Sequence, residues 1–510
     1  MYRNIECPSC SSTNQRKLNG ELALHYPGRM RILLSVFCTC FALAASPPAQ
    51  AHRPMDDPGK LGHYAVGHTS YMQTDTARGN RPVYLDVWYP VDAGSITGSA
   101  SPAQYPLDPY SSNLPISSSK DWEAIGYDPA YEGSVPSNSG PFPLLMFSTG
   151  FGIDSWQQLF MGTRLASHGY VVAVVDHYAD CQWSWSPCDD VLTAMVNRPR
   201  DVSFAITELL AKSAGLGDVL SGTVDHQRIA VSGHSLGGYA AYALTGGDRL
   251  VCDVLAVALA GIEPLPYPPN TCVRTFPDRR TKAMISLDGS SWLLRYRELA
   301  KIVVPTLIMG ETVDQSQAVG EAGGLPEIRS WIARPHAAID RLDSYRVDVN
   351  GANHYSFTNY CDGGYVFFNL GLISGDDLAA WENSWPCSST GFAPVTISSA
   401  DEHLVVTKYM IAFLDVYFRN RDVKLSLDRQ ILTEEYALDH KPQVQFFNSE
   451  HCEATLPDKS YFSYRAYQVS RECDVQKKDP TGWFTSKTNS GNPNLSLRNP
   501  AFSLRPPRPF

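Results

Sequence analysis

The sequence is poor in positive charge and in long apolar runs. Only 18% of its 510 residues are charged, and 42 Lys and Arg face 52 Asp and Glu, which gives a net charge of −10. A large nucleic-acid-binding face needs clustered positive charge, so this balance argues against nucleic acid as a partner. The one apolar run of notable length lies near the N-terminus, which excludes a polytopic membrane protein.

The composition is otherwise that of a folding globular chain, with 43% hydrophobic residues. The length is compatible with about three domains or with one large α/β domain that carries insertions.

The apolar run at residues 32–45 predicts a signal peptide. It is too short to span a bilayer comfortably, Arg29 and Arg31 flank it, and the small residues Ala49 and Ala51 follow it. We therefore expect cleavage after Ala51 and a secreted or periplasmic protein with no stable membrane span in the mature chain.

The alternative is an N-terminal anchor that stays in place. Pro47 and Pro48 argue against it, because they interrupt the helix that a permanent anchor needs. An export signal normally stands at the start of a chain, so we expect translation to begin at Met30 and residues 1–51 to be absent from the mature protein.

Eight of the twelve cysteines lie beyond residue 51, an even number that in an exported protein suggests disulfides. Pairing of sequence neighbours is the simplest hypothesis among the 105 possible connectivities. The alternative is a set of buried free thiols. The expected pairs are Cys181 with Cys188, Cys252 with Cys272, Cys361 with Cys387 and Cys452 with Cys473.

Short apolar runs alternate with helical patterns along residues 52–425, which predicts a doubly wound α/β fold with a mostly parallel sheet. The expected strands are 83–89, 143–148, 170–175, 228–232, 254–259, 282–287, 303–309 and 345–349, and the expected helices include 156–168 and 201–210.

Two stretches depart from this alternation, the Ser-, Pro- and Gly-rich residues 91–140 and the aromatic-rich residues 356–400. We expect both to be loop insertions in the catalytic domain, and the second to be bracketed by a disulfide. Residues 426–478 then form a C-terminal extension and 479–510 a disordered tail.

Ser235 is the candidate nucleophile. It stands in Gly233-His234-Ser235-Leu236-Gly237, directly after an expected strand and before a helix-forming segment. In that context the motif predicts a strained strand-to-helix turn that projects the serine hydroxyl above the sheet, with the dipole of the following helix favouring negative charge nearby. The alternative is a Gly-rich connection with an incidental serine.

A serine nucleophile needs a base, and the base needs an acid to orient it. On this fold the order along the chain is serine, acid, histidine. His354 is the candidate base because it lies in a turn-prone segment after the last expected strand. Asp288 and Asp314 each follow a strand on the same edge of the sheet, and from spacing alone they are equivalent candidates; a helix-capping aspartate is the alternative for both.

An oxyanion needs backbone N–H donors. One should be the amide of Leu236, the residue after the nucleophile. The other should come from the loop Ser148-Thr-Gly-Phe-Gly152, where Phe151 is the natural donor.

Several of these segments together resemble the platelet-activating factor acetylhydrolase and dienelactone-hydrolase-like branch of the α/β-hydrolases. The resemblance covers roughly residues 62–420 and rests on GHSLGG, FSTGFG, LASHGYVVAVVDH, RPRDVSFAITELL and ISLDGSSW. It implies carboxylic ester hydrolysis and favours Asp288 over Asp314, since the acid of that branch follows the strand that reads ISLDG. The sequence departs from the branch at Thr149-Gly150, where His-Gly is usual, and in the insertion after His354.

The sequence thus predicts an exported serine hydrolase that cleaves small-molecule or lipid-like esters through an acyl-enzyme and needs no metal or organic cofactor. The imidazole must be neutral to act, so activity should fall below about pH 6 to 7. The alternatives are a polyester- or lipid-type hydrolase that uses Asp314, a peptidase of the same fold, and a non-catalytic binding protein on a hydrolase scaffold.

Overall fold

The computed structural model describes residues 56–110, 114–178, 189, 191–246, 276–291, 294, 296–313, 328–339, 341–390, 394–419, 427–433, 436–437 and 444–448. The predictions for the signal peptide, the strand at 254–259, Asp314, the tail and three of the four disulfides lie outside these residues. The fourth expected disulfide, Cys361–Cys387, is confirmed.

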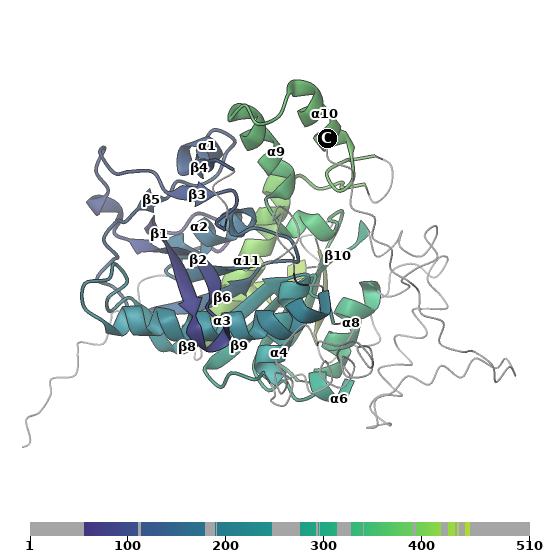
Figure 1. Cartoon of the computed structure of the whole chain (residues 1–510). Coiled ribbons are helices and arrows are strands. Elements are labelled where there is room, and N and C mark those ends of the chain that lie inside the picture. Colours follow the sequence, from purple (N-terminus) through teal and green to yellow (C-terminus); the bar gives the residue numbers. More distant parts are fainter. Residues whose placement is uncertain are drawn as a thin grey trace, which may run out of the picture. The chain divides into compact units, whose positions relative to one another are not determined.

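A ten-stranded sheet organises the described chain, and it confirms the expected doubly wound, mostly parallel architecture (Figure 1). The six central strands run parallel in the order β7-β6-β8-β9-β10-β11, and antiparallel strands flank them on both sides. The strands of this sheet are β1 (Ala65–Asp75), β2 (Arg81–Val91), β5 (Tyr131–Glu132), β6 (Phe142–Ser148), β7 (Val171–His177), β8 (Val224–His234), β9 (Thr281–Leu287), β10 (Thr306–Glu311), β11 (Ser344–Val349) and β12 (Val444–Asn448).

Helices cover both faces of the sheet, and each face has its own apolar core. One core holds side chains of α3 (Val191–Ala214), α4 (Leu236–Gly246), α6 (Tyr296–Leu299) and α8 (Ile328–Ala338). The other holds side chains of α2 (Leu159–Ser167), α9 (Tyr360–Asn369), α11 (Ser399–Phe418) and α12 (Leu427–Ile431). Every residue of β6 and β7 is buried, as continuous apolar runs between two helical layers should be.

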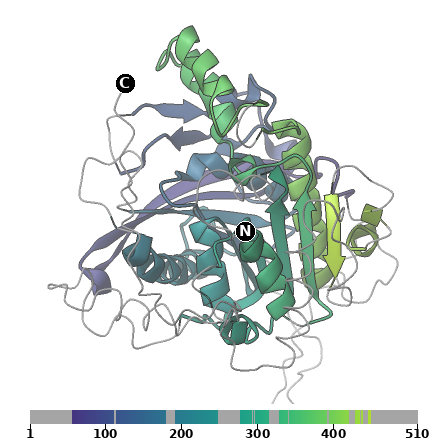
Figure 2. The ribbon, with the colours of Figure 1, turned by 90° about the vertical axis from the view of Figure 1, so that its right-hand side faces the viewer.

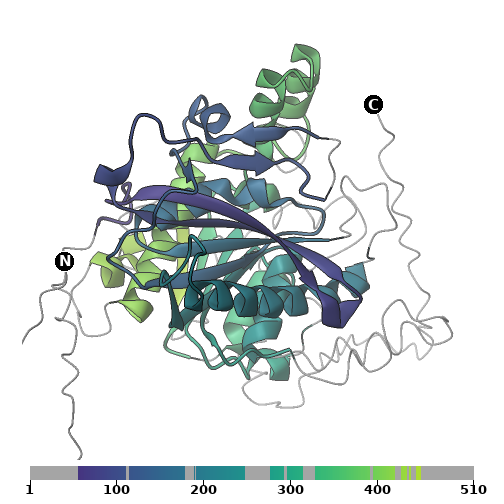
Figure 3. The same ribbon diagram turned by 60° about the vertical axis from the view of Figure 1, so that its left-hand side comes forward.

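Toward its edges the sheet holds β1, β5 and β12, which were not predicted from the sequence, beside β2, which was predicted at 83–89. β1 and β2 form a long antiparallel pair, drawn in purple in Figure 3. Along residues 69–74 of β1, half-buried side chains alternate with exposed ones. At the opposite edge, β12 pairs antiparallel with β11 (Figure 2). Residues assigned from the sequence to a C-terminal extension therefore add a strand to the sheet.

The two insertions contain secondary structure. The first holds η2 (Ala93–Ser95), the two-stranded sheet of β3 (Gln104–Pro106) and β4 (Ile116–Ser118), and α1 (Ser119–Glu123). The second holds α9 and α10 (Gly375–Asn383), which stand beyond the sheet at the top of Figures 1 to 3. Three short 3-10 helices complete the described elements: η1 (Thr76–Arg78), η3 (Ser155–Gln158) and η5 (His354–Phe357). No described helix has both the length and the apolar character that crossing a bilayer requires.

The helix expected from Asp201 begins ten residues earlier, at Val191, and includes Pro199. Asp201 is therefore not a first-turn residue that stabilises the helix dipole. Its buried carboxylate instead accepts hydrogen bonds from Arg81 Nε at 3.0 Å and from His177 Nδ1 at 3.0 Å, and it pairs with Arg78 Nη1 at 2.6 Å. Burial alone would raise the pKa of this carboxyl, but the facing Arg81, His177 and Arg78 hold it well below its usual range.

A buried histidine links the strands at the β1 edge. His68 Nε2 lies 2.9 Å from Asp86 Oδ1, and its Nδ1 lies 2.8 Å from Glu132 Oε2, so the ring joins β1, β2 and β5. Burial alone lowers the pKa of His68, but hydrogen bonds and charges from Asp86 and Glu132 outweigh it and raise this pKa to about 9.

The raised pKa predicts a stability that falls in alkali. A histidine with a pKa of about 9 in the folded state and 6.5 when unfolded contributes fully below pH 6.5, and this contribution is lost as the pH rises through 9. Denaturant unfolding at pH 6.5 and 9.5 should show a larger loss of unfolding free energy for the wild type than for His68→Gln. The exposed His226→Gln should behave like the wild type; equal losses in all three proteins would contradict the prediction.

Candidate active site

The candidate residues gather at the carboxyl ends of four parallel strands. Ser235 follows β8, Asp288 follows β9, His354 follows β11 after a short turn, and the loop of residues 149–152 follows β6. Since parallel strands end on the same edge of a sheet, one edge receives all four segments.

Ser235 occupies a tight turn between β8 and α4. Its φ of 54° lies in the left-handed region, which non-glycine residues rarely adopt and which is a form of strain found at functional sites. The two flanking glycines are required by close backbone contacts: a Cβ on Gly233 would lie 2.2 Å from the carbonyl carbon of Gly237, and a Cβ on Gly237 would lie 1.9 Å from the oxygen of Ser148.

His354 and Asp288 are in direct contact. The Nδ1 atom of His354 is hydrogen-bonded to Oδ2 of Asp288, whose side chain is fully buried, while 20% of the His354 side chain is exposed. Asp288 also has a positive φ, 43°, and its amide donates to the carbonyl of Met309 at 2.7 Å, which ties the carboxylate to β10. The carboxylate of Asp288 itself, and not only the strand that precedes it, therefore contacts His354.

Two contacts place the Ser235 turn beside this pair. The amide of Ser235 donates to the carbonyl of Leu287, the residue before Asp288, at 3.1 Å. His234 Nε2 lies 2.8 Å from the carbonyl oxygen of His354, and the two imidazole rings are 4.6 Å apart. Burial, followed by the neighbouring His354, holds the pKa of His234 well below its usual value, so His234 is neutral and donates from Nε2.

The loop after β6 lies against the start of α4. Leu236 is the first residue of α4 and is buried, and the backbone of Gly237 packs on the carbonyls of Ser148 and Thr149. Phe151 lies in the same loop, three residues after Ser148, and its side chain is half-buried. The segments that carry the two predicted oxyanion donors are therefore neighbours.

A buried arginine donates two hydrogen bonds to this loop. The guanidinium of Arg198, which is fully buried in α3, donates from Nη1 to the carbonyl of Thr149 and from Nη2 to that of Gly150 at 2.8 Å. Two donors from one rigid planar group fix the carbonyls of Thr149 and Gly150. Each carbonyl shares a peptide plane with the N–H of the next residue, so the amides of Gly150 and Phe151 are fixed in direction as well.

A second buried contact fixes the start of the same loop. Burial, followed by the charge of Arg198, lowers the pKa of His177 to about 3, so its ring is neutral. Its Nδ1 donates to Asp201 at 3.0 Å, and its Nε2 then accepts the hydroxyl proton of Ser148 at 2.8 Å. The position of Ser148 thus depends on the charge network of α3.

Three of these positioning residues, Arg198, His177 and His234, were not among the site residues predicted from the sequence. The signal for the last was its place inside the glycine motif. Arg198 and His177 lie within segments that carry the family resemblance, but nothing in the sequence around either of them indicates a contact with the loop at 148–150. The other candidate acid, Asp314, lies outside the described residues.

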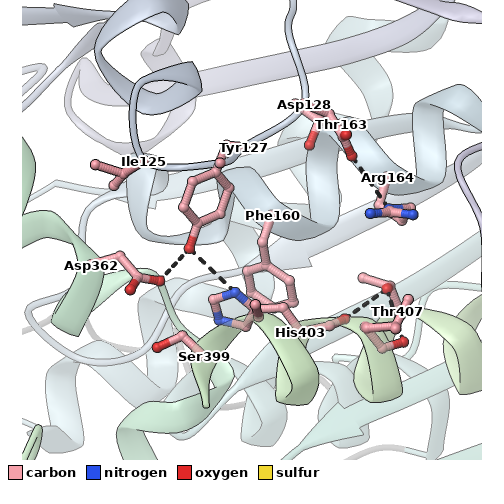
Figure 4. Close-up of a pocket in the computed structure, with 13 residues that line it drawn as sticks. Ile125, Tyr127, Asp128, Phe160, Thr163, Arg164, Asp362, Ser399, His403 and Thr407 are labelled. Atoms are coloured by element: carbon pink, nitrogen blue, oxygen red, sulfur yellow. Dashed lines mark hydrogen bonds and ion pairs between the residues drawn. The ribbon is translucent and has the colours of Figure 1, made fainter.

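A separate cavity lies where the two insertions meet α2 and α11 (Figure 4). Tyr127 of the first insertion donates to Asp362 of α9, its hydroxyl lies 3.3 Å from His403 Nδ1, and Arg164 pairs with Asp128 at 3.4 Å. The described residues that line it include none of the candidate active-site residues. Its acidic side chains are already engaged, Asp128 by Arg164 and Asp362 by the hydroxyl of Tyr127. We read it as the junction that anchors the second insertion.

Two family models match parts of the chain. The model for platelet-activating factor acetylhydrolase, isoform II, matches residues 51–208, and the chlorophyllase model matches residues 133–290. A ferulic acid esterase from Streptomyces cinnamoneus is similar to the chain at 22% sequence identity over 79% of this chain and 98% of that chain, with a TM-score of 0.43. None of the curated proteins matches the chain.

The sheet topology and the two family models define the chain as an α/β-hydrolase. Both family models describe esterases of this class, and together they reach from the start of the sheet to the loop after β9. Within the class the chain is a carboxylic ester hydrolase, as the sequence analysis expected.

Because Arg198 holds two carbonyls of the loop, its replacement should lower the catalytic rate without weakening substrate binding. Arg198→Met removes both donors, so the loop amides should lose their fixed direction and kcat should fall by about 10²-fold, the usual effect of losing one oxyanion donor. KM for a small ester should change less than threefold. Steady-state kinetics and the melting temperature should be measured for this variant, for Arg198→Lys and for the exposed control Arg279→Met; an Arg198→Met enzyme of normal kcat would contradict the assignment.

Proposed function

We propose that Ser235, His354 and Asp288 form the catalytic triad of an exported ester hydrolase. The observation that carries the proposal is the hydrogen bond between His354 Nδ1 and the buried Asp288, at the turn that presents Ser235. A carboxylate on Nδ1 fixes the tautomer in which Nε2 can accept a proton, as a serine nucleophile requires.

The reaction begins with the transfer of the Ser235 hydroxyl proton to Nε2 of His354 as the oxygen attacks the ester carbonyl. The tetrahedral intermediate collapses when the imidazolium returns this proton to the leaving alcohol. Water then attacks the acyl-enzyme with His354 again as the base, which releases the carboxylic acid and regenerates the serine. Asp288 orients the ring and stabilises its charged form in both halves.

The amides of Leu236 and Phe151 are the proposed donors to the oxyanion. Their support is the backbone packing of Gly237 against residues 148 and 149 and the two hydrogen bonds from Arg198. Donors held in place before the reaction stabilise the developing charge without reorganisation. The amide end of α4, which begins at Leu236, favours the same negative charge.

The proposal predicts distinct effects for the two candidate acids. Ser235→Ala should lose roughly 10⁵-fold or more in kcat for a short-chain ester, and Asp288→Asn roughly 10⁴-fold, because the amide stabilises the wrong imidazole tautomer. Asp314→Asn should retain kcat within about threefold. Initial rates should be measured together with covalent labelling by a fluorophosphonate, followed by intact mass.

Each outcome of this experiment is informative. Wild-type protein that fails to label and to hydrolyse any ester would overturn the hydrolase proposal. Loss of activity in Asp314→Asn with retention in Asp288→Asn would transfer the role of the acid to Asp314. Faster cleavage of anilides than of matching esters would favour a peptidase.

We also propose that the protein is exported after cleavage at Ala51. The support is the sequence pattern at residues 29–51 and the disulfide between Cys361 and Cys387, since disulfides persist mainly in oxidising compartments. Expression of the chain from Met30 in a bacterial host should yield a mature protein in the periplasm or medium whose first residue, by N-terminal mass spectrometry, is His52. Intact chain retained in the cytoplasm would contradict export.

A further inference from the structure

Four aromatic rings in mutual contact extend from His354 and branch at Tyr355. The ring of Tyr355 lies 5.8 Å from that of His354, edge to face. It also lies 5.3 Å from Trp385, again edge to face, and 5.2 Å from Tyr360, which stacks on Trp381 at 4.7 Å. We call Tyr355, Tyr360, Trp381 and Trp385 the aromatic row.

The aromatic row lies at the margin of the apolar core, and of its four rings only Trp381 packs against that core. Trp385 is 48% exposed, and the other three side chains are half-buried, whereas Trp88 and Trp122 in the core are at most 1% exposed. Large aromatic side chains stabilise a fold by burial, so partly exposed rings beside a reacting group leave apolar faces available to a ligand.

The row is held rigidly at both ends. Asn353, which is fully buried, caps η5 by accepting from the amide of Tyr355 at 3.1 Å, and its Nδ2 donates to the carbonyl of Pro386, next to Trp385, at 2.7 Å. The Cys361–Cys387 disulfide joins the two ends of the segment that carries Trp381 and Trp385.

Further contacts hold the inner part of the segment. A Cβ on Gly364 would lie 3.1 Å from the Trp381 ring, so the helix backbone itself supports that ring. Tyr127 anchors α9 through Asp362 (Figure 4). Rings positioned before binding cost little entropy when a ligand stacks on them.

The charges around the row narrow the ligand class. The second insertion, residues 356–400, contains Asp362, Asp376, Asp377 and Glu382 and no Lys, Arg or His. No cation of this segment can pair with a substrate carboxylate or phosphate, and the acidic side chains would repel an anionic product. The row therefore suits an uncharged ester and favours release of the carboxylate after cleavage.

We propose that the aromatic row binds the ring of an uncharged aromatic ester and so sets the specificity of this enzyme. The proposal rests on the role of Ser235 and His354 proposed above. Of the four rings in the row, Tyr355 is the one that contacts His354, so the substrate ring lies within a few bonds of the scissile carbonyl, on the acyl or the alcohol side. Aromatic rings gain from edge-to-face and offset stacking beyond the area they bury, whereas saturated rings of the same size do not.

Matched pairs of substrates test the proposal. Benzyl acetate and cyclohexylmethyl acetate differ only in the aromaticity of the alcohol. Methyl phenylacetate and methyl cyclohexylacetate differ only in that of the acid, because the methylene group keeps the ring out of conjugation with the carbonyl. The kcat/KM of the wild type should favour the aromatic member of at least one pair by roughly 2- to 10-fold, mainly through KM. The pair that shows the preference identifies the side of the ester that the row contacts.

Variants of the row should remove this preference. In Trp385→Leu and Tyr360→Leu, which keep an apolar side chain, the aromatic-to-saturated ratio should fall to about 1. Phe368→Leu is the matched control, because Phe368 is 44% exposed on the same segment but lies outside the row; it should keep the wild-type ratio.

The outcomes separate this inference from the proposed function. If the wild type neither labels with a fluorophosphonate nor hydrolyses any ester, or if Ser235→Ala hydrolyses esters as the wild type does, the proposed function fails. If the wild type labels at Ser235 but hydrolyses neither aromatic ester, this inference alone is overturned. If hydrolysis depends on Ser235 but the wild-type ratio is about 1, or if both row variants keep an elevated ratio, the aromatic row is not the specificity wall and this inference alone is overturned.

Discussion

The contact between the imidazole of His354 and the buried carboxylate of Asp288 is the interaction on which the proposed chemistry depends. It joins two segments that are 66 residues apart in sequence, at the ends of β9 and β11. The strained turn of Ser235 has a function only if this pair lies beside it, and the contacts of His234 with His354 and of Ser235 with Leu287 place it there. The parallel sheet supplies the rigid edge that keeps these segments in register.

Polar groups beneath the site hold the loop after β6. Arg198 of α3 and His177 at the end of β7 contact residues 148–150. The carboxylate of Asp201 accepts from His177 and pairs with Arg78 and Arg81. Such buried ionic groups are costly to desolvate, and they are tolerated when every partner is in place. Here they fix backbone carbonyls at the position where an ester hydrolase needs well-directed amides, which gives the network a functional explanation as well as a structural one.

The sequence predicted those features that depend on local pattern. The buried parallel strands were recognisable because β6 and β7 consist of apolar runs that turn polar only at their carboxyl ends. The turn at Ser235 was recognisable from its spaced glycines, of which Gly233 meets a local contact with Gly237, whereas the contact of Gly237 with Ser148 is long-range. Long-range contacts were not predictable in this way. Pro199 concealed the first turns of α3, the alternating β1 contains too many polar residues to be recognised as a strand, and nothing near Arg198 indicates its contact with a loop 48 residues earlier.

A crystal structure of the protein after reaction with a small fluorophosphonate tests the central claim most directly. The account predicts phosphorus bonded to Ser235 Oγ, one phosphoryl oxygen about 3 Å from the amides of Leu236 and Phe151, and His354 Nε2 directed at the adduct with Nδ1 still on Asp288. An adduct on another residue, or an imidazole of His354 turned away from Ser235 and separated from Asp288, would contradict it.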